Sequence, residues 1–147
     1  MEKLAKNKSG SGLKIKDQIL PLTNLDIERL GKVLKIKNFR GVFMKDQLPK
    51  KIREKEWGII NLENYYQEGS HWVAYYKNKD EKYYFDSYGK LPPPRALDRY
   101  LGYKNIEQNK WRFKNYDDPP ICGHLCLKVL KGLSKGKKYR DVLLGLY

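Results

Sequence analysis

Cys122, His71 and Asp86 are the residues of this chain whose types and surroundings could support nucleophilic catalysis. Cys122 precedes apolar residues at helical spacing, which predicts a thiol in the first turn of an amphipathic helix (Leu125, Cys126, Val129, Leu130 and Leu133). Unpaired backbone N–H groups at a helix start, together with the positive end of the helix dipole, favour a thiolate over a thiol. His71 and Asp86 each lie in a strand-like run, so a base and an orienting carboxylate are also available.

Each of these residues also has a purely structural interpretation. A cysteine at the head of an apolar helix can simply fill the core, because free cysteine behaves as a small hydrophobic residue. His71 could lie at a sheet edge, and Asp86 could open a turn. The combination and order of all three favours the chemical interpretation. On the same predicted helix, His124 falls on the polar side and Cys126 on the apolar side, so we expect neither to take part in catalysis.

Strands are needed to bring the histidine and the carboxylate together. Aromatic and β-branched residues predict strands over Trp57–Leu62, His71–Tyr76 and Lys82–Asp86. Residues 77–80 form a plausible hairpin turn, so His71 and Asp86 can lie on adjacent antiparallel strands near the same end.

Further elements are predicted on either side of these strands. Thr23 or Asn24 caps a helix through about Leu34, whose apolar side comprises Leu25, Ile27, Leu30 and Val33, and a Lys-rich loop carrying Phe39, Val42 and Phe43 follows it. We then expect a helix over Arg95–Leu101, a strand over Lys110–Phe113, a loop delivering Cys122, and a last helix over Tyr139–Leu144.

Composition limits the class of protein. The 147 residues suit one domain, which we place at residues 20–147 after a flexible basic arm over residues 1–19. Lys and Arg number 31 against 17 Asp and Glu, and the formal charge of +14 attracts polyanions such as nucleic acid. Two cysteines four residues apart give neither a disulfide framework nor a zinc site. We find no signal-peptide pattern and no apolar run of membrane-spanning length, and we therefore expect an intracellular protein without membrane contact.

Short motifs give the chain a family resemblance. Gly-x-His-Trp at 69–72, Tyr-x-Phe-Asp-x-Tyr-Gly at 83–89 and Cys-Gly-His-x-Cys at 122–126 resemble the signature blocks of the adenovirus maturation protease (adenain) family. Relatives of that family occur in virophages, Maverick/Polinton elements and other large-DNA viruses. The order His, Asp, Cys is also that of the wider SUMO-protease superfamily, whereas papain-like enzymes have the cysteine before the histidine.

The resemblance implies a fold and a set of roles. The fold would be α+β, a single domain with a mixed, mainly antiparallel central sheet flanked by helices and the nucleophile at the start of a buried helix. Cys122 would be the nucleophile, His71 the base and Asp86 its orienting partner, with Trp72, Gly69 and Ser70 lining a narrow substrate channel. The oxyanion hole would comprise the backbone of Cys122 and Gly123, with Asn115 at the position where the family usually has a longer glutamine.

The function implied is that of a viral-type cysteine endopeptidase, which cleaves capsid or core precursor proteins at Gly-containing sites during virion maturation. It would need no metal or other cofactor, would act as a monomer in the virion or at an intracellular assembly site (nucleus or cytoplasmic virus factory), and could take a peptide or DNA as activator. Two alternatives stay open: a protease that removes SUMO- or ubiquitin-like modifiers, and a non-catalytic basic nucleic-acid-binding protein on a protease scaffold.

Overall fold

The computed structural model describes residues 14–15, 18–19, 22–63, 71–89, 91–113 and 121–146. Its elements, in chain order, are β1 (Lys14–Ile15), β2 (Gln18–Ile19), α1 (Asn24–Val33), β3 (Phe39–Met44), β4 (Lys55–Asn61), β5 (Trp72–Asn78), β6 (Glu81–Phe85), α2 (Arg95–Leu101), β7 (Ile106–Gln108), α3 (Cys122–Ser134) and α4 (Tyr139–Leu144). The predicted helices over Arg95–Leu101 and Tyr139–Leu144 have the bounds expected from the sequence.

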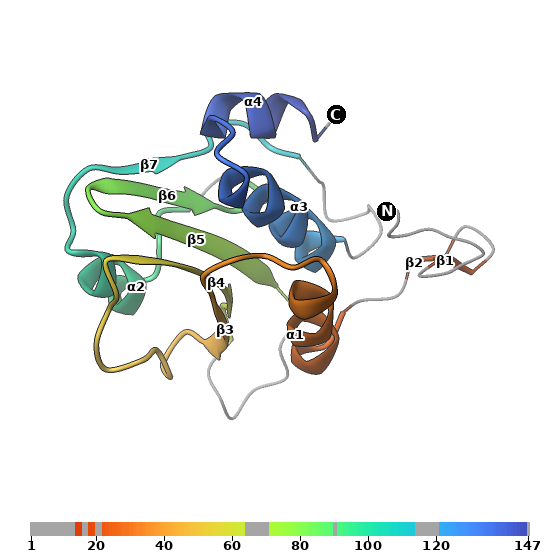
Figure 1. The fold of residues 1–147 in the computed structure, drawn as a ribbon, viewed down its shortest axis with the longest axis horizontal. Coiled ribbons are helices and arrows are strands. Elements are labelled where there is room, and N and C mark those ends of the chain that lie inside the picture. Colours follow the sequence, from red (N-terminus) through yellow and green to blue (C-terminus); the bar gives the residue numbers. More distant parts are fainter. Residues whose placement is uncertain are drawn as a thin grey trace.

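A mixed five-stranded sheet forms the centre of the fold, with the strand order β3-β4-β5-β6-β7 (Figure 1). The inner pairs β4–β5 and β5–β6 are antiparallel. The outer strands β3 and β7 each run parallel to their neighbour. The α+β class with a mixed sheet and flanking helices is therefore confirmed.

The two faces of the sheet are covered by different helices. Along β5, Trp72, Ala74 and Tyr76 belong to the larger core cluster, which includes most of the apolar residues of α3 and parts of α1 and α4. Val73 and Tyr75 point to the opposite face and pack with α2. This alternation follows from the period of two along a strand and gives three layers, with α3 lying across β5 in Figure 1.

Helix α1 packs through a narrower face than the sequence predicted. Its start is the expected Thr23 cap, which forms a reciprocal capping box with Asp26. Leu25 and Val33 are 65% and 67% exposed, so they do not belong to the apolar side. The buried positions are Ile27 and Gly31; a Cβ on Gly31 would lie 2.7 Å from the ring of Phe39. Leu25 and Val33 each lie two positions from one of these buried residues, which is more than half a turn around a helix, so they face solvent.

Two strand predictions were wrong. The Lys-rich segment expected to be a loop contains β3, whose residues are all half-buried, so its sequence has no apolar alternation to mark it. A register shift between Phe39 and Gly41 also interrupts its pairing with β4. The strand expected over Lys110–Phe113 is instead β7 at Ile106–Gln108. The aromatic residues that suggested a strand, Trp111 and Phe113, pack side by side beyond it.

Most of the predicted N-terminal arm lies outside the described residues. Within the segment 1–19, the structure describes only the antiparallel pair of β1 and β2. Over the part of the chain that is described, none of the helices has the length and apolar character needed to span a membrane.

Candidate active site

The β5–β6 hairpin brings His71 and Asp86 together. His71 immediately precedes β5 and Asp86 immediately follows β6, and the register pairs Ala74 with Phe85. Antiparallel strands therefore place both residues at the same edge of the sheet. His71 Nε2 lies 2.8 Å from Asp86 Oδ1, and the two side chains are 17% and 4% exposed. This separation is that of a strong, charge-assisted hydrogen bond.

A neighbouring turn residue also orients the Asp86 carboxylate. The backbone N–H of Tyr88 donates to Asp86 Oδ1 at 2.9 Å, and the ring of Tyr88 lies against the imidazole of His71 at a centroid distance of 4.5 Å. The carboxylate is thus held by a local turn of the type that aspartate commonly forms. The imidazole is held from one side by the carboxylate and from another by an aromatic ring.

Cys122 is the first residue of α3 and is 4% exposed. Burial would raise the pKa of its thiol. The adjacent His71 side chain with its positive charge, together with the backbone N–H groups of Trp72 and Gly123, outweighs burial and holds the pKa of the thiol below its ordinary value. Cys122 therefore lies where a thiolate is favoured, at a helix start and beside a cationic imidazole.

The imidazole shows the complementary effect. Burial lowers the pKa of His71, but the hydrogen bonds and charges of Asp86 and Cys122 outweigh it and raise the pKa to about 9. Near neutral pH His71 is therefore protonated, and its positive charge favours the thiolate form of Cys122. The arrangement can accept a proton from a thiol, store it, and return it to a leaving group.

Trp72 and Gly123 pack tightly around the thiol. Trp72 Nε1 donates to the carbonyl of Leu22 at 3.1 Å, which fixes the indole just before α1. A Cβ on Gly123 would lie 3.2 Å from Ile27 Cδ1 and 3.4 Å from both Leu22 and Trp72. This close packing explains why position 123 is a glycine, and it leaves the backbone N–H of Gly123 beside the sulfur of Cys122.

The structure thus brings together His71, Asp86, Cys122, Trp72 and Gly123. The other residues predicted for the site, Gly69, Ser70 and Asn115, lie outside the described residues. Sequence reasoning missed Asn109, whose side chain contacts the backbone of Asp86. A single asparagine after a short strand belongs to no motif, so only the fold could reveal this contact.

The other histidine and cysteine of the chain, His124 and Cys126, have pKa shifts opposite to those of His71 and Cys122. His124 is half-buried rather than solvent-facing as predicted, and burial lowers its pKa to about 4. Among the described residues, neither of its ring nitrogens has a hydrogen-bond partner. Cys126 is fully buried, and burial raises the pKa of its thiol well above the ordinary value. Both residues are therefore neutral at physiological pH.

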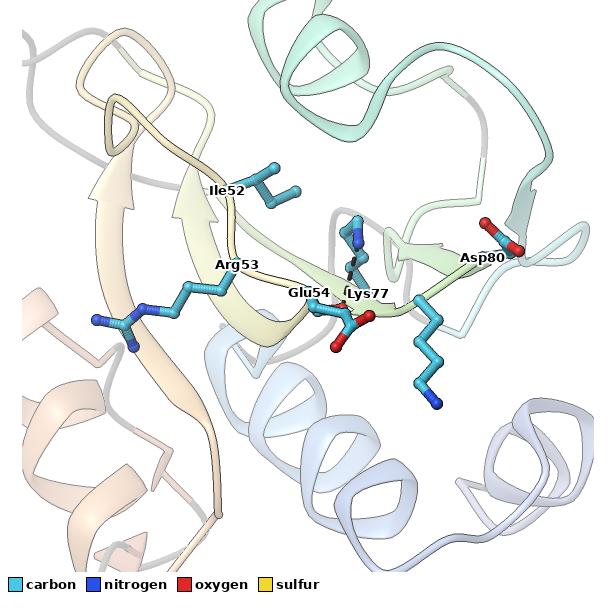
Figure 2. A pocket seen from close by; sticks show the side chains of 6 residues that line it. Ile52, Arg53, Glu54, Lys77 and Asp80 are labelled. Atoms are coloured by element: carbon cyan, nitrogen blue, oxygen red, sulfur yellow. Dashed lines mark hydrogen bonds between the residues drawn. The ribbon is translucent and has the colours of Figure 1, made fainter.

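Two surface hollows in the described part of the chain lie away from the candidate site residues. One, of about 470 Å³, lies at the β5–β6 turn, at the opposite end of β5 from His71 (Figure 2). Its walls carry both signs of charge and comprise Ile52, Arg53, Glu54, Lys77, Lys79 and Asp80. The other, of about 410 Å³, lies between the segment 45–52 and α2. Within the described ranges, the structure has no group of three or more His, Cys, Asp or Glu placed to hold a metal ion.

Comparison of the fold with solved structures gives matches to cysteine proteases. The ASFV pS273R protease matches with a TM-score of 0.54 at 18% identity, covering 84% of this chain and 61% of that protein. The SUMO protease Ulp1, solved with its catalytic cysteine oxidised to a sulfinic acid, matches with a TM-score of 0.51 at 15% identity, covering 91% of this chain and 76% of that protein. This chain therefore shares the fold of these two proteases. It spans less than two thirds of the length of the ASFV protein.

Sequence comparisons add no closer relative. A scan against protein-family models finds no match, and a search of curated proteins finds none either.

Proposed function

We propose that this chain is a cysteine endopeptidase in which Cys122 is the nucleophile, His71 the general base and acid, and Asp86 the group that orients His71. The observation that carries the proposal is the shared position of the three side chains. His71 Nε2 lies 2.8 Å from Asp86, and the same imidazole interacts with a Cys122 thiol whose pKa is lowered. The fold likeness to cysteine proteases supports the same reaction class.

The reaction follows from these positions. His71 takes the proton of the Cys122 thiol, and the sulfur attacks the carbonyl carbon of a peptide bond, moving the π electrons of that carbonyl onto its oxygen. The backbone N–H groups of Cys122 and Gly123 stabilise the oxyanion. As the intermediate collapses, the C–N bond breaks and His71 protonates the departing amine. Water then hydrolyses the thioester, giving a carboxylate and restoring the thiol–imidazole pair.

We further propose that the substrates are viral structural or core precursor proteins, cut at Gly-containing sites during particle assembly. The motif resemblance supports this assignment, as does the fold likeness to a protease of ASFV. The indole of Trp72 packs against Gly123, the residue after the nucleophile, where a large ring would favour residues without side chains next to the cut bond. Asn115, as a further oxyanion donor, and Gly69 and Ser70, as substrate contacts, remain part of this proposal.

Nucleic acid is the proposed partner of the basic surface. A formal charge of +14 would hold the enzyme on condensed genome through phosphate contacts, which raises its encounter rate with basic precursors bound to the same polyanion. Such binding should weaken steeply with salt. A peptide or DNA activator also belongs to the proposal, and the site of action would be the virion or an intracellular assembly site.

Removal of a SUMO- or ubiquitin-like modifier is the second candidate function. The observation in its favour is the match to SUMO protease Ulp1, which extends over 91% of this chain. Both candidates use the same reaction and differ in the partner that docks next to Cys122.

A cleavage assay separates these candidates. The purified protein is given Gly-containing peptides in one series and modifier conjugates with Gly–Gly isopeptide bonds in another. We expect cleavage of the peptides, loss of cleavage in Cys122→Ala, and retention in the matched control Cys126→Ala, which makes the same thiol-to-methyl change one helical turn further along. Cleavage of conjugates alone would favour the second candidate. Cleavage that survives Cys122→Ala, or none on any substrate, would contradict both.

A further inference from the structure

Asn109 is a buried polar residue that directly contacts the segment carrying Asp86. It is 2% exposed and follows the last residue of β7. Its Oδ1 atom accepts a hydrogen bond from the Asp86 backbone N–H at 3.0 Å, and its Nδ2 atom donates to the Asp86 carbonyl at 2.7 Å. One side-chain amide therefore pairs with both backbone polar groups of Asp86.

This pairing extends the sheet beyond its last strand. β7 runs parallel to β6, and the ladder between them ends at the pair Tyr84 and Gln108. Asp86 lies just past the end of β6 and beyond the last pair of the described ladder, and the Asn109 amide bonds its backbone groups there. A carboxamide offers a donor and an acceptor in one planar group, which is the pattern that a backbone partner presents.

Asn109 is itself held in position. Its Nδ2 atom makes a further hydrogen bond to the carbonyl of Trp111 at 3.0 Å. The backbone of Asn109 also lies next to the hydroxyl of Tyr139 in α4, which donates to the carbonyl of Tyr84 at 2.6 Å. The amide is thus held by its own segment, whose backbone lies next to α4, so it can hold Asp86 rather than follow it.

The segment after Asn109 packs along the turn that contains Asp86. The backbone N–H of Phe113 donates to the carbonyl of Ser87 at 2.7 Å. Gly89, at φ 66°, leaves no room for a side chain, because a Cβ there would lie 2.6 Å from the Trp111 carbonyl oxygen. Residues 86–89 and 109–113 therefore form one docked unit, and Asn109 supplies the bonds at the end nearest the carboxylate.

We propose that Asn109 is a positioning residue, which fixes the backbone of Asp86 so that its carboxylate stays within hydrogen-bonding distance of His71. This inference rests on the proposed function, since it assigns a role within the same site. The Asp86 carboxylate projects from the clamped backbone to His71 Nε2 at 2.8 Å. A displacement of about 1 Å at a catalytic group is enough to cost on the order of 10² in rate.

The test measures how fast Cys122 reacts with iodoacetamide as a function of pH, using mass spectrometry to follow its peptide. In the parent protein, the rate should rise through an inflection below the ordinary thiol value of 9.0. In Asn109→Ala, we expect that inflection to move upward by about half to one pH unit, with kcat for peptide cleavage falling about tenfold at unchanged KM. If Asn109→Ala does not fold, Asn109→Ser takes its place with the same expected direction.

Tyr100→Phe is the control, because it also removes side-chain hydrogen bonds, one donated to Glu56 at 2.9 Å and one accepted from Arg40 at 3.5 Å, but beside α2 on the other face of the sheet. It should lower thermal stability without moving the inflection. An equal shift in both variants, or no shift in Asn109→Ala, would overturn the inference while leaving the proposed function intact. Absence of enhanced Cys122 reactivity in the parent would instead overturn the proposed function.

A second comparison uses Asp86→Ala as the background. If Asn109 acts through Asp86, then Asn109→Ala should add no further shift once Asp86 is gone. A shift of the same size in both backgrounds would show that Asn109 affects the thiol by another route and would overturn the proposed role.

Discussion

Replacing Asp86 by asparagine removes the charge that faces His71 while keeping the size of the side chain. Burial lowers the pKa of His71, and the hydrogen bonds and charges of Asp86 and Cys122 outweigh burial to raise it from 6.5 to about 9. The net rise of about 2.5 pH units corresponds to about 3 kcal/mol in favour of the imidazolium. In Asp86→Asn only Cys122 remains to oppose burial, so we expect the pKa of His71 to fall by about 1 to 2 pH units.

The loss should also slow proteolysis. The Asn side chain can present its amide nitrogen to His71 and stabilise the wrong tautomer, and replacement of the carboxylate in such a triad costs on the order of 10² to 10⁴ in kcat. In the parent, the thiolate–imidazolium pair exists only above the lowered pKa of Cys122 and below about 9, so activity should decline as pH rises through 9. In Asp86→Asn this alkaline limit should move towards neutrality.

Proton NMR of the imidazole rings measures this effect directly. The chain has two histidines, and the pKa of the other one, His124, is about 4, so the two titrations are well separated. Asp80→Asn, at the exposed far end of the same hairpin, is the matched control and should leave both titrations unchanged. A His71 titration that stays near 9 in Asp86→Asn, or that lies near 6.5 in the parent, would refute the reasoning.

Two further predictions concern stability. The pKa of His124 is lowered from 6.5 to about 4, so the unfolded chain binds a proton more readily than the folded chain between these pH values. Acidification from pH 7 to 4.5 should therefore lower the free energy of unfolding by about 2 kcal/mol, and this loss should be absent in His124→Leu. Urea unfolding at both pH values measures the effect, and an equal loss in the variant would contradict it. Glu56 is fully buried and accepts hydrogen bonds from Arg40, the Arg53 backbone, Tyr75 and Tyr100. Glu56→Gln should therefore lower the free energy of unfolding by about 2 to 4 kcal/mol, while folded molecules keep their activity. Thermal unfolding that is unchanged from the parent would exclude a stabilising role for Glu56.

Local sequence signals were sufficient for the helices and for the central hairpin. Pro94 before Arg95 and the left-handed Gly102 after Leu101 limit α2 on both sides, and these are the residues that sequence rules use. The hairpin carried a clear aromatic and β-branched pattern, so the meeting of His71 and Asp86 followed from its predicted pairing. The apolar stripe that begins at Cys122 marked α3 in the same way.

What the sequence did not reveal depends on contacts between distant segments. β3 is a half-buried parallel edge strand interrupted at Gly41, and neither property leaves a local pattern. Trp111 and Phe113 have strand-like composition but pack beside the Asp86 turn, since the Phe113 N–H bonds to Ser87 rather than to a strand.

The candidate site shows the same contrast between features marked by local sequence and features that depend on distant contacts. The types of the reacting groups were visible in short motifs, whereas the group that holds Asp86 in place was not. Asn109 gains its position only because β7 runs parallel to β6 and ends next to the Asp86 backbone. Residues that act on backbone atoms of a remote segment need no fixed spacing in the sequence, so motif analysis passes over them.

The ionisation of Cys122 is the most direct test of the account. Thiolate absorbs ultraviolet light and thiol does not, so the difference spectrum between the parent and Cys122→Ser, followed over pH, reports this sulfur alone. We expect thiolate to form below the ordinary value of 9.0 and to require a higher pH in His71→Ala. Thiolate that forms only near or above 9.0 in the parent, or at the same pH with and without His71, would contradict a nucleophile paired with this imidazole.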